Sequence, residues 1–107
     1  MYIGEYGADA WNANIDSEDQ DSQAVATTRL LNEITEHDTL NGGPCTGGII
    51  FEWADEWWKA GNRNSHDKGG IAPGGGPYPD RVFNEEYWGL VKIDRTPRKA
   101  YYAYKNA

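Results

Sequence analysis

The residues with the clearest chemical potential are carboxylates that directly follow predicted strands and stand among aromatic side chains. Glu5 lies near the end of an apolar and aromatic segment, residues 2–6, that predicts a short strand before the turn at Gly7. A second acidic and aromatic group, residues 52–58, follows an apolar run. A carboxylate can attack or stabilise an oxocarbenium-like centre, and indole faces stack on the apolar faces of sugar rings. The sequence therefore predicts a carbohydrate site, with Tyr6 beside the carboxylate.

The second group supplies further candidate sugar-binding residues, Trp53, Asp55 and Trp57. Each candidate also has a purely structural interpretation. Glu5 can be an ordinary strand-end carboxylate paired with an arginine or a backbone amide, and composition alone favours that interpretation. At least one of Trp53, Trp57 and Trp58 is expected in the core. Because neighbouring side chains do not share a face, Trp57 and Trp58 are expected to divide between core and cleft.

The acidic segment around residue 18 is a weaker signal for a cation site. Asp16, Asp19 and Asp21 do not have the spacing or the glycine of an EF-hand loop, so a solvated start of a helix is favoured. His37 and His66 have no second ligand at a metal-binding spacing, and we expect both on the surface. No metal site is therefore predicted, and no cofactor.

Two other features are also expected to carry no chemistry. The glycine run 74–76 has no following Gly-Lys-Ser/Thr and no preceding strand, so it is not a phosphate loop. Cys45 is the single cysteine, which excludes an intrachain disulfide and a multi-cysteine zinc site. With no base at a suitable spacing, it is expected to be a small buried residue.

The elements that must position these residues alternate in type. Residues 2–6 and 47–53 predict strands, and the second is apolar enough to be buried on both faces, as in parallel sheets. Residues 20–37 predict a helix that begins in an acidic segment and ends before Asn41-Gly-Gly-Pro. Its expected packing stripe comprises Ala24, Thr28 and Leu31, with Leu30 and Ile34 beside it.

The second half of the chain is less regular. Residues 54–83 predict a long loop, and such loops are often functional. Residues 84–89 predict one helical turn. A last helix is expected to have Thr96 as its N-cap and Pro97 at its first position. Its packing face comprises Ala100, Tyr101 and Tyr104.

This order of strand, helix, strand, long loop and helix predicts an α/β fold with parallel strands. The chain of 107 residues is expected to form a single domain, residues 1–107. Two parallel strands alone leave two open edges and too little cover. Either the loop contributes strands or another chain completes the sheet, and the thin aliphatic core favours a homo-oligomer.

Charge and hydropathy exclude several classes of protein. Ten Lys and Arg residues against seventeen Asp and Glu residues give a formal net charge of -7, which argues against a nucleic-acid partner. No run of apolar residues is long enough to span a membrane, and nothing after Met1 has the pattern of a signal peptide. The localisation stays open.

Three segments together resemble the family 2 glycoside hydrolases, the β-glucuronidase and β-galactosidase group. Residues 5–10 resemble the family's Glu-Tyr-Gly-Ala-Asp segment, and residues 47–56 resemble its barrel strand eight. Residues 89–100, with Asp-Arg-Thr-Pro-Arg, resemble the segment that leads into barrel helix eight. The three matches occur in the family's order and span nearly the whole chain.

The resemblance implies that Glu5 is the catalytic nucleophile after strand seven and that Trp53 forms the floor of the sugar site. It also implies a quarter to half of a (β/α)8 barrel, because a full barrel needs about 250 residues. The family's acid/base after strand four is missing, and Asn84-Glu85 lies after strand eight and does not replace it. Retaining hydrolysis needs two carboxyl groups.

Three functions follow as expectations. The chain is a glycosidase-like fragment that is inactive alone and completed by self-association. Alternatively, it is a retaining glycosidase that recruits its second carboxylate from a neighbouring copy or from Glu52, Asp55, Glu56 or Glu86. The third alternative is a carbohydrate-binding or purely structural module.

Overall fold

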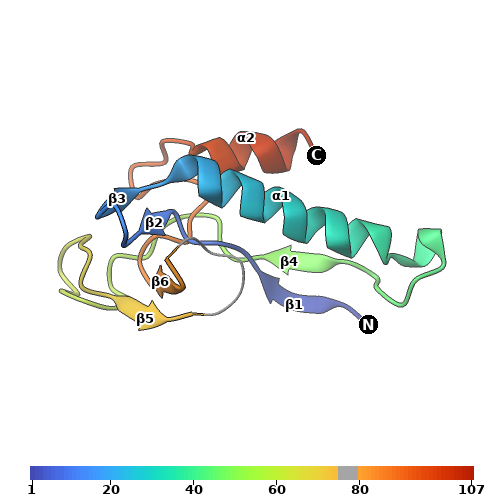
Figure 1. The fold of residues 1–107 in the computed structure, drawn as a ribbon, viewed down its shortest axis with the longest axis horizontal. Coiled ribbons are helices and arrows are strands. Elements are labelled where there is room, and N and C mark those ends of the chain that lie inside the picture. Colours follow the sequence, from blue (N-terminus) through green and yellow to red (C-terminus); the bar gives the residue numbers. More distant parts are fainter. Residues whose placement is uncertain (75–79) are drawn as a thin grey trace.

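The arrangement of the chain is known from a computed structural model, which describes residues 1–74 and 80–107. The elements in chain order are β1 (Ile3–Tyr6), β2 (Trp11–Asn12), β3 (Ser17–Glu18), α1 (Gln20–Glu36), the 3-10 turn η1 (Thr39–Asn41), β4 (Gly48–Ile50), β5 (Ile71–Pro73), β6 (Val82–Asn84) and α2 (Lys99–Lys105). Both helices lie on one side of the neighbouring strands β1 and β4, and the other strands gather at one end of the molecule (Figure 1).

The strands β1 and β4 pair in parallel, with α1 as the connection between them. The Ile3 amide donates to the Gly47 carbonyl over 2.9 Å, and the Phe51 amide donates to the Tyr6 carbonyl over 2.7 Å. The parallel pairing predicted from the sequence is observed for β1 and β4, but the order differs from the prediction, because β2 and β3 lie between β1 and α1. The carboxyl ends of both strands therefore point to the same end of the molecule, where β2, β3, β5 and β6 lie.

The expected partial (β/α)8 barrel is wrong. The described residues form three sheets of two strands each, β1–β4, β2–β3 and β5–β6, and only the first is parallel. After β4 the chain enters turns and bends, and the next elements among the described residues are β5 and β6. The long loop does contribute strands, as one of the two alternatives proposed. These strands pair with each other and do not extend the β1–β4 sheet, because β5 and β6 satisfy their backbone groups mutually.

Helix α1 begins where it was predicted, but its most buried face is shifted by one residue from the expected stripe. The side chain of Asp19 caps the helix by accepting a 3.0 Å hydrogen bond from the Ser22 amide. The residues it buries are Gln23 and Thr27, both polar. Gln23 is buried because its amide nitrogen donates to the carbonyls of Ala8 and Gly89, each over 3.1 Å. The apolar pattern missed this face because both of its buried residues are polar.

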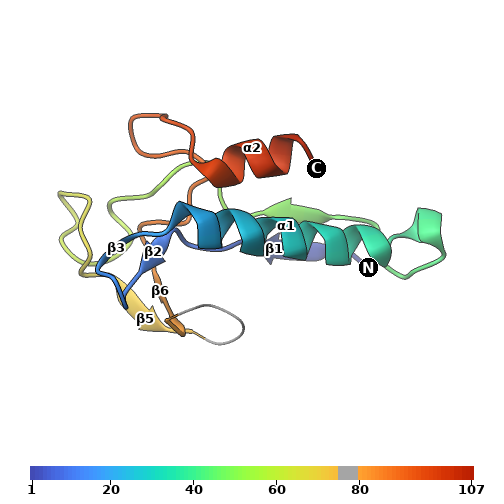
Figure 2. The ribbon, with the colours of Figure 1, turned by 45° about the horizontal axis from the view of Figure 1, so that its top comes forward.

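Two predictions for the last third of the chain are also wrong. Residues 84–89 form the end of β6 and a turn, not a helical turn. Helix α2 begins at Lys99 with Arg98 as its N-cap, two residues later than predicted. Pro97 instead bridges to Val91 and the Arg98 amide donates to the Leu90 carbonyl, so tertiary hydrogen bonds hold these residues extended. Figure 2 shows α2 beside α1, against which it packs.

The buried interior contains few large aliphatic side chains. Cys45 is 2% exposed, as predicted for a small buried residue. Ala100 of the predicted α2 face is fully buried, whereas Leu40 is 93% exposed. The other buried apolar residues are Tyr6, Ala8, Ala10, Tyr87, Leu90 and Val91. Among the described residues, no helix has the length and apolar character required to cross a membrane.

Asp9, in the turn after β1, joins this turn to β6. Asp9 is buried, and its carboxylate accepts a 2.8 Å hydrogen bond from the Asn84 amide in β6. Burial raises the pKa of Asp9 from 3.8 to about 7, against the opposing effect of that hydrogen bond. The turn after β1 is thereby held against the β5–β6 pair.

Candidate functional site

Glu5 lies in β1, one residue before its carboxyl end, and its side chain is exposed in an open cleft of about 460 Å³. The end of β1 closely approaches the loop after β4, because a Cβ atom on Gly7 would collide with the Phe51 carbonyl. Only glycine permits this approach without displacing one of the two segments. The cleft is lined by Glu5, Tyr6, Gly7, Phe51, Lys59, Phe83, Glu85 and Trp88.

Aromatic rings form one wall of this Glu5 cleft. Trp88 packs edge-on against Phe51, with ring centroids 5.8 Å apart, and against Phe83, at 5.5 Å. The ammonium group of Lys59 lies 4.4 Å from the centroid of the Phe51 ring, a cation–π distance. A cleft with an exposed carboxylate, a second carboxylate at Glu85 and an aromatic wall can hold a sugar ring beside a nucleophile.

A second acidic group lies in the segment that follows β4. Burial, together with the neighbouring Glu56, raises the pKa of Glu52 from 4.5 to about 8. Lys59 pairs with Glu56 over 3.2 Å. The raised pKa favours the protonated form of Glu52. Glu52 is not among the residues that line the Glu5 cleft.

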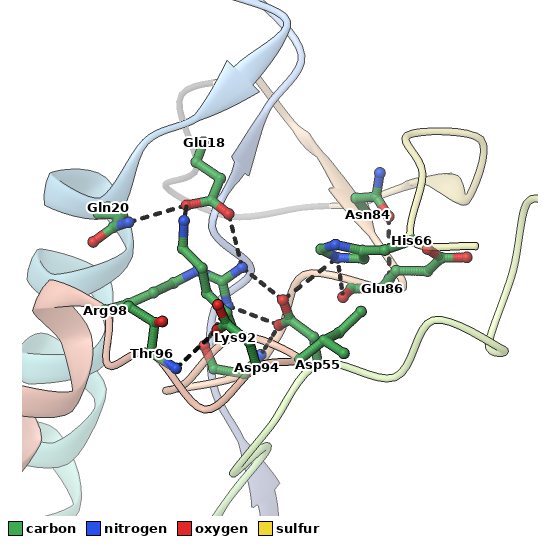
Figure 3. Close-up of polar contacts among 12 residues, drawn as sticks. Glu18, Gln20, Asp55, His66, Asn84, Glu86, Lys92, Asp94, Thr96 and Arg98 are labelled. Carbon is green, nitrogen blue, oxygen red and sulfur yellow. Dashed lines mark hydrogen bonds and ion pairs between the residues drawn. The ribbon is translucent and has the colours of Figure 1, made fainter.

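Asp55 follows β4 and has entirely different surroundings from Glu5. It is 2% exposed and accepts two hydrogen bonds from the guanidinium of Arg98, at 2.7 and 2.6 Å. The Gly89 amide donates a third hydrogen bond to this carboxylate over 2.8 Å. Figure 3 shows Asp55 between Arg98 and His66. In the described structure its carboxylate serves a buried ion pair.

Arg98 is the centre of this buried network, and its side chain is fully buried. Besides Asp55, it donates to the Gly89 carbonyl over 2.9 Å and to Glu18 in β3 over 3.0 Å. Burial by itself raises the pKa of Glu18, but the hydrogen bond and charge of Arg98 outweigh it and lower that pKa from 4.5 to about 2. Lys92 also pairs with Glu18, over 3.2 Å. The network thus joins β3 to the segments that follow β4 and precede α2.

His66 was expected on the surface, and it is half-buried, with 25% of its side chain exposed. Its Nε2 atom lies 3.4 Å from Asp55 and 3.2 Å from the Glu86 carbonyl. Its ring stacks on Tyr87, with centroids 4.1 Å apart. The sequence offered no spacing signal for this contact because it joins segments far apart in the chain. His37 is exposed, as predicted.

The three tryptophans after β4 are all exposed, so the prediction that one of them is a core residue is wrong. Trp53 is 57% exposed, and its ring lies 5.9 Å from that of Tyr101 in α2. Trp57 and Trp58 do not divide between core and cleft, because their rings contact each other edge-on, at 4.6 Å. Trp53, Asp55 and Trp57 are not among the lining residues of the Glu5 cleft.

Tyr6 is the predicted site residue that remains next to Glu5. It is buried at the cleft wall, and burial together with a hydrogen bond to Tyr104 raises the pKa of its phenol. Asp19 caps α1, in agreement with the predicted helix start. The hydrogen bonds that it accepts from Ser22 lower its pKa and outweigh the opposing effect of burial. Within residues 1–74 and 80–107, no group of three or more His, Cys, Asp or Glu side chains is placed to hold a metal ion.

The structure brings residues to the sites that sequence reasoning either missed or, in the case of Glu85, set aside. Phe83, Glu85 and Trp88 reach the Glu5 cleft from the segment around β6. Arg98 was part of the Asp-Arg-Thr-Pro-Arg segment that resembles the glycosidases, but its role as a buried partner had no sequence signal. The pairing of Asp55 with a residue 43 positions later is set by tertiary structure alone.

Comparison with known proteins gives a likeness of fold. A crystal structure of a GH2 beta-galacturonidase from Eisenbergiella tayi, bound to glycerol, superposes with a TM-score of 0.57 and 19% sequence identity. The likeness covers 98% of this chain, and the chain spans 16% of the enzyme's length. No protein-family model matches the sequence, and no curated protein matches it significantly. The chain is thus related in fold to a part of a glycoside hydrolase.

Proposed function

We propose that this chain carries the nucleophile of a retaining glycoside hydrolase site, with Glu5 as that nucleophile. The observation that carries the proposal is the position of Glu5, exposed near the carboxyl end of β1 in a cleft with an aromatic wall. The Glu-Tyr-Gly-Ala-Asp segment and the likeness of fold to a GH2 enzyme support it. The substrate class is an O-glycoside, and uronides belong in the test because the similar enzyme is described as a beta-galacturonidase.

The chemistry assigned to Glu5 needs no second carboxyl group when the leaving group is good. A carboxylate oxygen of Glu5 attacks the anomeric carbon, the bond from that carbon to the leaving oxygen breaks, and the leaving group departs with the electron pair. A dinitrophenolate leaves without being protonated. Ordinary glycosides require an acid, and for them we expect the chain alone to be inactive.

The test is covalent labelling with 2,4-dinitrophenyl 2-deoxy-2-fluoro glycosides of the galactose, glucuronic acid and galacturonic acid series. We expect the intact mass to rise by one fluorosugar, on the peptide that contains Glu5, with release of dinitrophenol. Glu5→Gln should abolish labelling, and Glu85→Gln should leave it, because the activated leaving group needs no acid. Labelling that persists in Glu5→Gln, or labelling of other carboxylates alone, would contradict the proposal.

A complete hydrolase is a second candidate, favoured by the presence of Glu85 on the same cleft as Glu5. In this proposal Glu85, or a carboxylate of a second copy, protonates the leaving oxygen and then activates water. Turnover of phenyl glycosides should then be lost in Glu85→Ala, while external azide restores turnover of dinitrophenyl glycosides as glycosyl azide. Absence of turnover in the wild type at every protein concentration removes this candidate.

A binding module without chemistry is the third candidate, favoured by the exposure of Trp53, Trp57 and Trp58. Oligosaccharide binding that survives Glu5→Gln but is lost in Trp53→Ala would support it. Self-association is proposed as well, because large apolar side chains such as Leu40 and Ile49 are exposed. Sedimentation at micromolar concentration checks it, and a monomer would contradict it.

A further inference from the structure

A second cleft, of about 590 Å³, lies between β3, the turn after β6 and the loop before α2. It shares no lining residue with the Glu5 cleft. We call it the Trp11 cleft; its lining includes Trp11, Glu18, His66, Lys92 and Asp94. Neither the sequence nor the proposed function assigns it a role. Its volume falls in the range of small-molecule sites.

The floor of the Trp11 cleft consists of fixed ring systems. Trp11 and His66 are both half-buried, and both contact the ring of the buried Tyr87. The Trp11 and Tyr87 centroids are 4.9 Å apart at an interplanar angle of 48°, and those of His66 and Tyr87 are 4.1 Å apart at 27°. Because Tyr87 holds both rings, the cleft presents a preformed apolar surface that needs little ordering when a ligand binds.

Most charged side chains on the walls of the Trp11 cleft are paired with groups of opposite charge. Lys92 lies 3.2 Å from Glu18, which also accepts a hydrogen bond from the buried Arg98. Lys68 pairs with Asp16 at the rim over 2.6 Å. Figure 3 shows Glu18, Lys92 and Asp94 close together on one side of the Asp55–His66 contact. Of the three carboxylates that line the cleft, Asp16 is paired with Lys68, and Glu18 is paired with Lys92 and Arg98. The third, Asp94, accepts a 2.9 Å hydrogen bond from the Thr96 amide. Most of the charge on the walls is thus satisfied within the protein, which leaves little attraction for an ion of either sign.

A preformed aromatic floor with both donors and acceptors on its walls suits a ligand that is uncharged, has an apolar face and is rich in hydroxyl groups. We infer that the Trp11 cleft binds one or two units of a neutral saccharide, with a sugar face on Trp11 and its hydroxyls on Lys92 and Asp94. This site is independent of the nucleophile proposed at Glu5. It would hold a neutral part of a glycan away from the reacting bond.

The test is a titration of the 15N-labelled chain with neutral disaccharides, followed by amide and indole NMR resonances. Galacturonic acid and glucosamine serve as anionic and cationic probes. We expect saturable shifts at the Trp11 indole and the Lys92 and Asp94 amides, with a dissociation constant on the order of 1 mM. Both charged probes should bind more weakly than the neutral sugars.

Matched variants separate the two clefts. Lys92→Met should weaken binding by about tenfold, whereas Lys59→Met, the same change in the Glu5 cleft, and Glu5→Gln should not alter it. Asp94→Asn and Lys92→Met carry the test if Trp11→Ala proves unfolded, because both side chains lie at the surface of the cleft. The inference is overturned if no saturable shift occurs at Trp11, Lys92 and Asp94, or if the shifts are confined to Trp53, Trp57 and Trp58. It is also overturned if Lys92→Met has no effect on binding, or if a charged probe binds more tightly than the neutral sugars. Fluorosugar labelling of Glu5 is a separate readout, so either proposal can fail alone.

Discussion

Glu5 and Asp55 occupy comparable places in the chain and have opposite surroundings. One lies at the end of β1 and the other follows β4, so the parallel pairing brings both to the same end of the molecule. Glu5 is exposed in an open cleft, whereas Asp55 is buried against Arg98, Gly89 and His66. The difference shows that a position at or after the carboxyl end of a strand brings a carboxylate to this end of the molecule. Whether the carboxylate is available for a ligand depends on whether a buried cation pairs with it.

The largest expected effect comes from removing the buried carboxylate. Asp55→Ala should lower the free energy of unfolding by about 3–5 kcal/mol, because it leaves the guanidinium of Arg98 buried without its main partner. Urea unfolding followed by circular dichroism measures this loss. The matched control, Glu5→Ala, should change stability by no more than about 0.5 kcal/mol. Equal losses in the two variants would break the contrast between the two carboxylates.

Asp9→Asn should produce the next largest effect, and it should be stabilising at neutral and alkaline pH. The pKa of Asp9 is about 7 in the folded chain and 3.8 ordinarily, so the folded state holds an extra proton between these values. Stability is therefore lost as pH rises from about 4 through about 7. The amide keeps an oxygen for the Asn84 amide and carries no charge. We expect a gain on the order of 2 kcal/mol at about pH 8 and none at about pH 3.

Thermal unfolding across this pH range provides the measurement for Asp9. The wild type and the variant should have parallel curves below about pH 4 and diverge above it. A variant that is less stable than the wild type at about pH 8 would show that the ionised carboxylate of Asp9 is favourable where it lies.

Glu18→Gln tests the half-buried arm of the Arg98 network and should have a smaller effect of opposite pH dependence. The pKa of Glu18 is lowered from 4.5 to about 2, so its stabilisation is complete above pH 4.5 and is lost as pH falls toward 2. Allowing for its partial exposure, we expect a loss of about 1 kcal/mol at neutral pH. The difference from the wild type, measured by urea unfolding, should narrow below about pH 4. A difference that is constant with pH would assign the effect to packing.

The smallest effect is expected at an exposed ion pair. Lys68 and Asp16 make a 2.6 Å contact, but their side chains are 59% and 64% exposed. Lys68→Met should change the free energy of unfolding by less than about 0.5 kcal/mol, because water screens the pair and holding two long side chains costs entropy. Measured beside Asp55→Ala, it separates the influence of burial from that of pairing. A loss as large as that of Asp55→Ala would contradict this separation.

Local signals predicted the elements that depend on local physics. The apolar segment of β1, the β-branched pair in β4 and the acidic start of α1 were all readable, since strand patterning and helix capping involve neighbouring residues. The parallel pairing followed from their order. The barrel did not, because strands β5 and β6 pair with each other. The start of α2 also shifted, because bridges and hydrogen bonds to Val91 and Leu90 hold Pro97 and Arg98 extended.

For the candidate site, too, the sequence predicted what depends on neighbouring residues and missed what depends on distant ones. Sequence placed Glu5 beside Tyr6 at the end of a strand, and the structure agrees with that placement. The sequence did not predict that Glu85 and Trp88 line the same cleft as Glu5, because these residues lie more than 70 positions further along the chain. The sequence also led us to expect at least one of Trp53, Trp57 and Trp58 in the core, whereas all three are exposed. An indole ring fits either environment, and its tertiary neighbours decide between them.

The sequence by itself determined where carboxylates and aromatic residues occur and that two strands flank a helix. These properties depend on residue types and on short-range spacing. Only the tertiary structure decided that Asp55 is enclosed by Arg98, that Glu5 remains open, and that Trp11 and His66 share the ring of Tyr87. Burial and the choice of hydrogen-bond partner depend on contacts between distant segments, and those contacts set whether a charged group holds the fold together or faces a ligand.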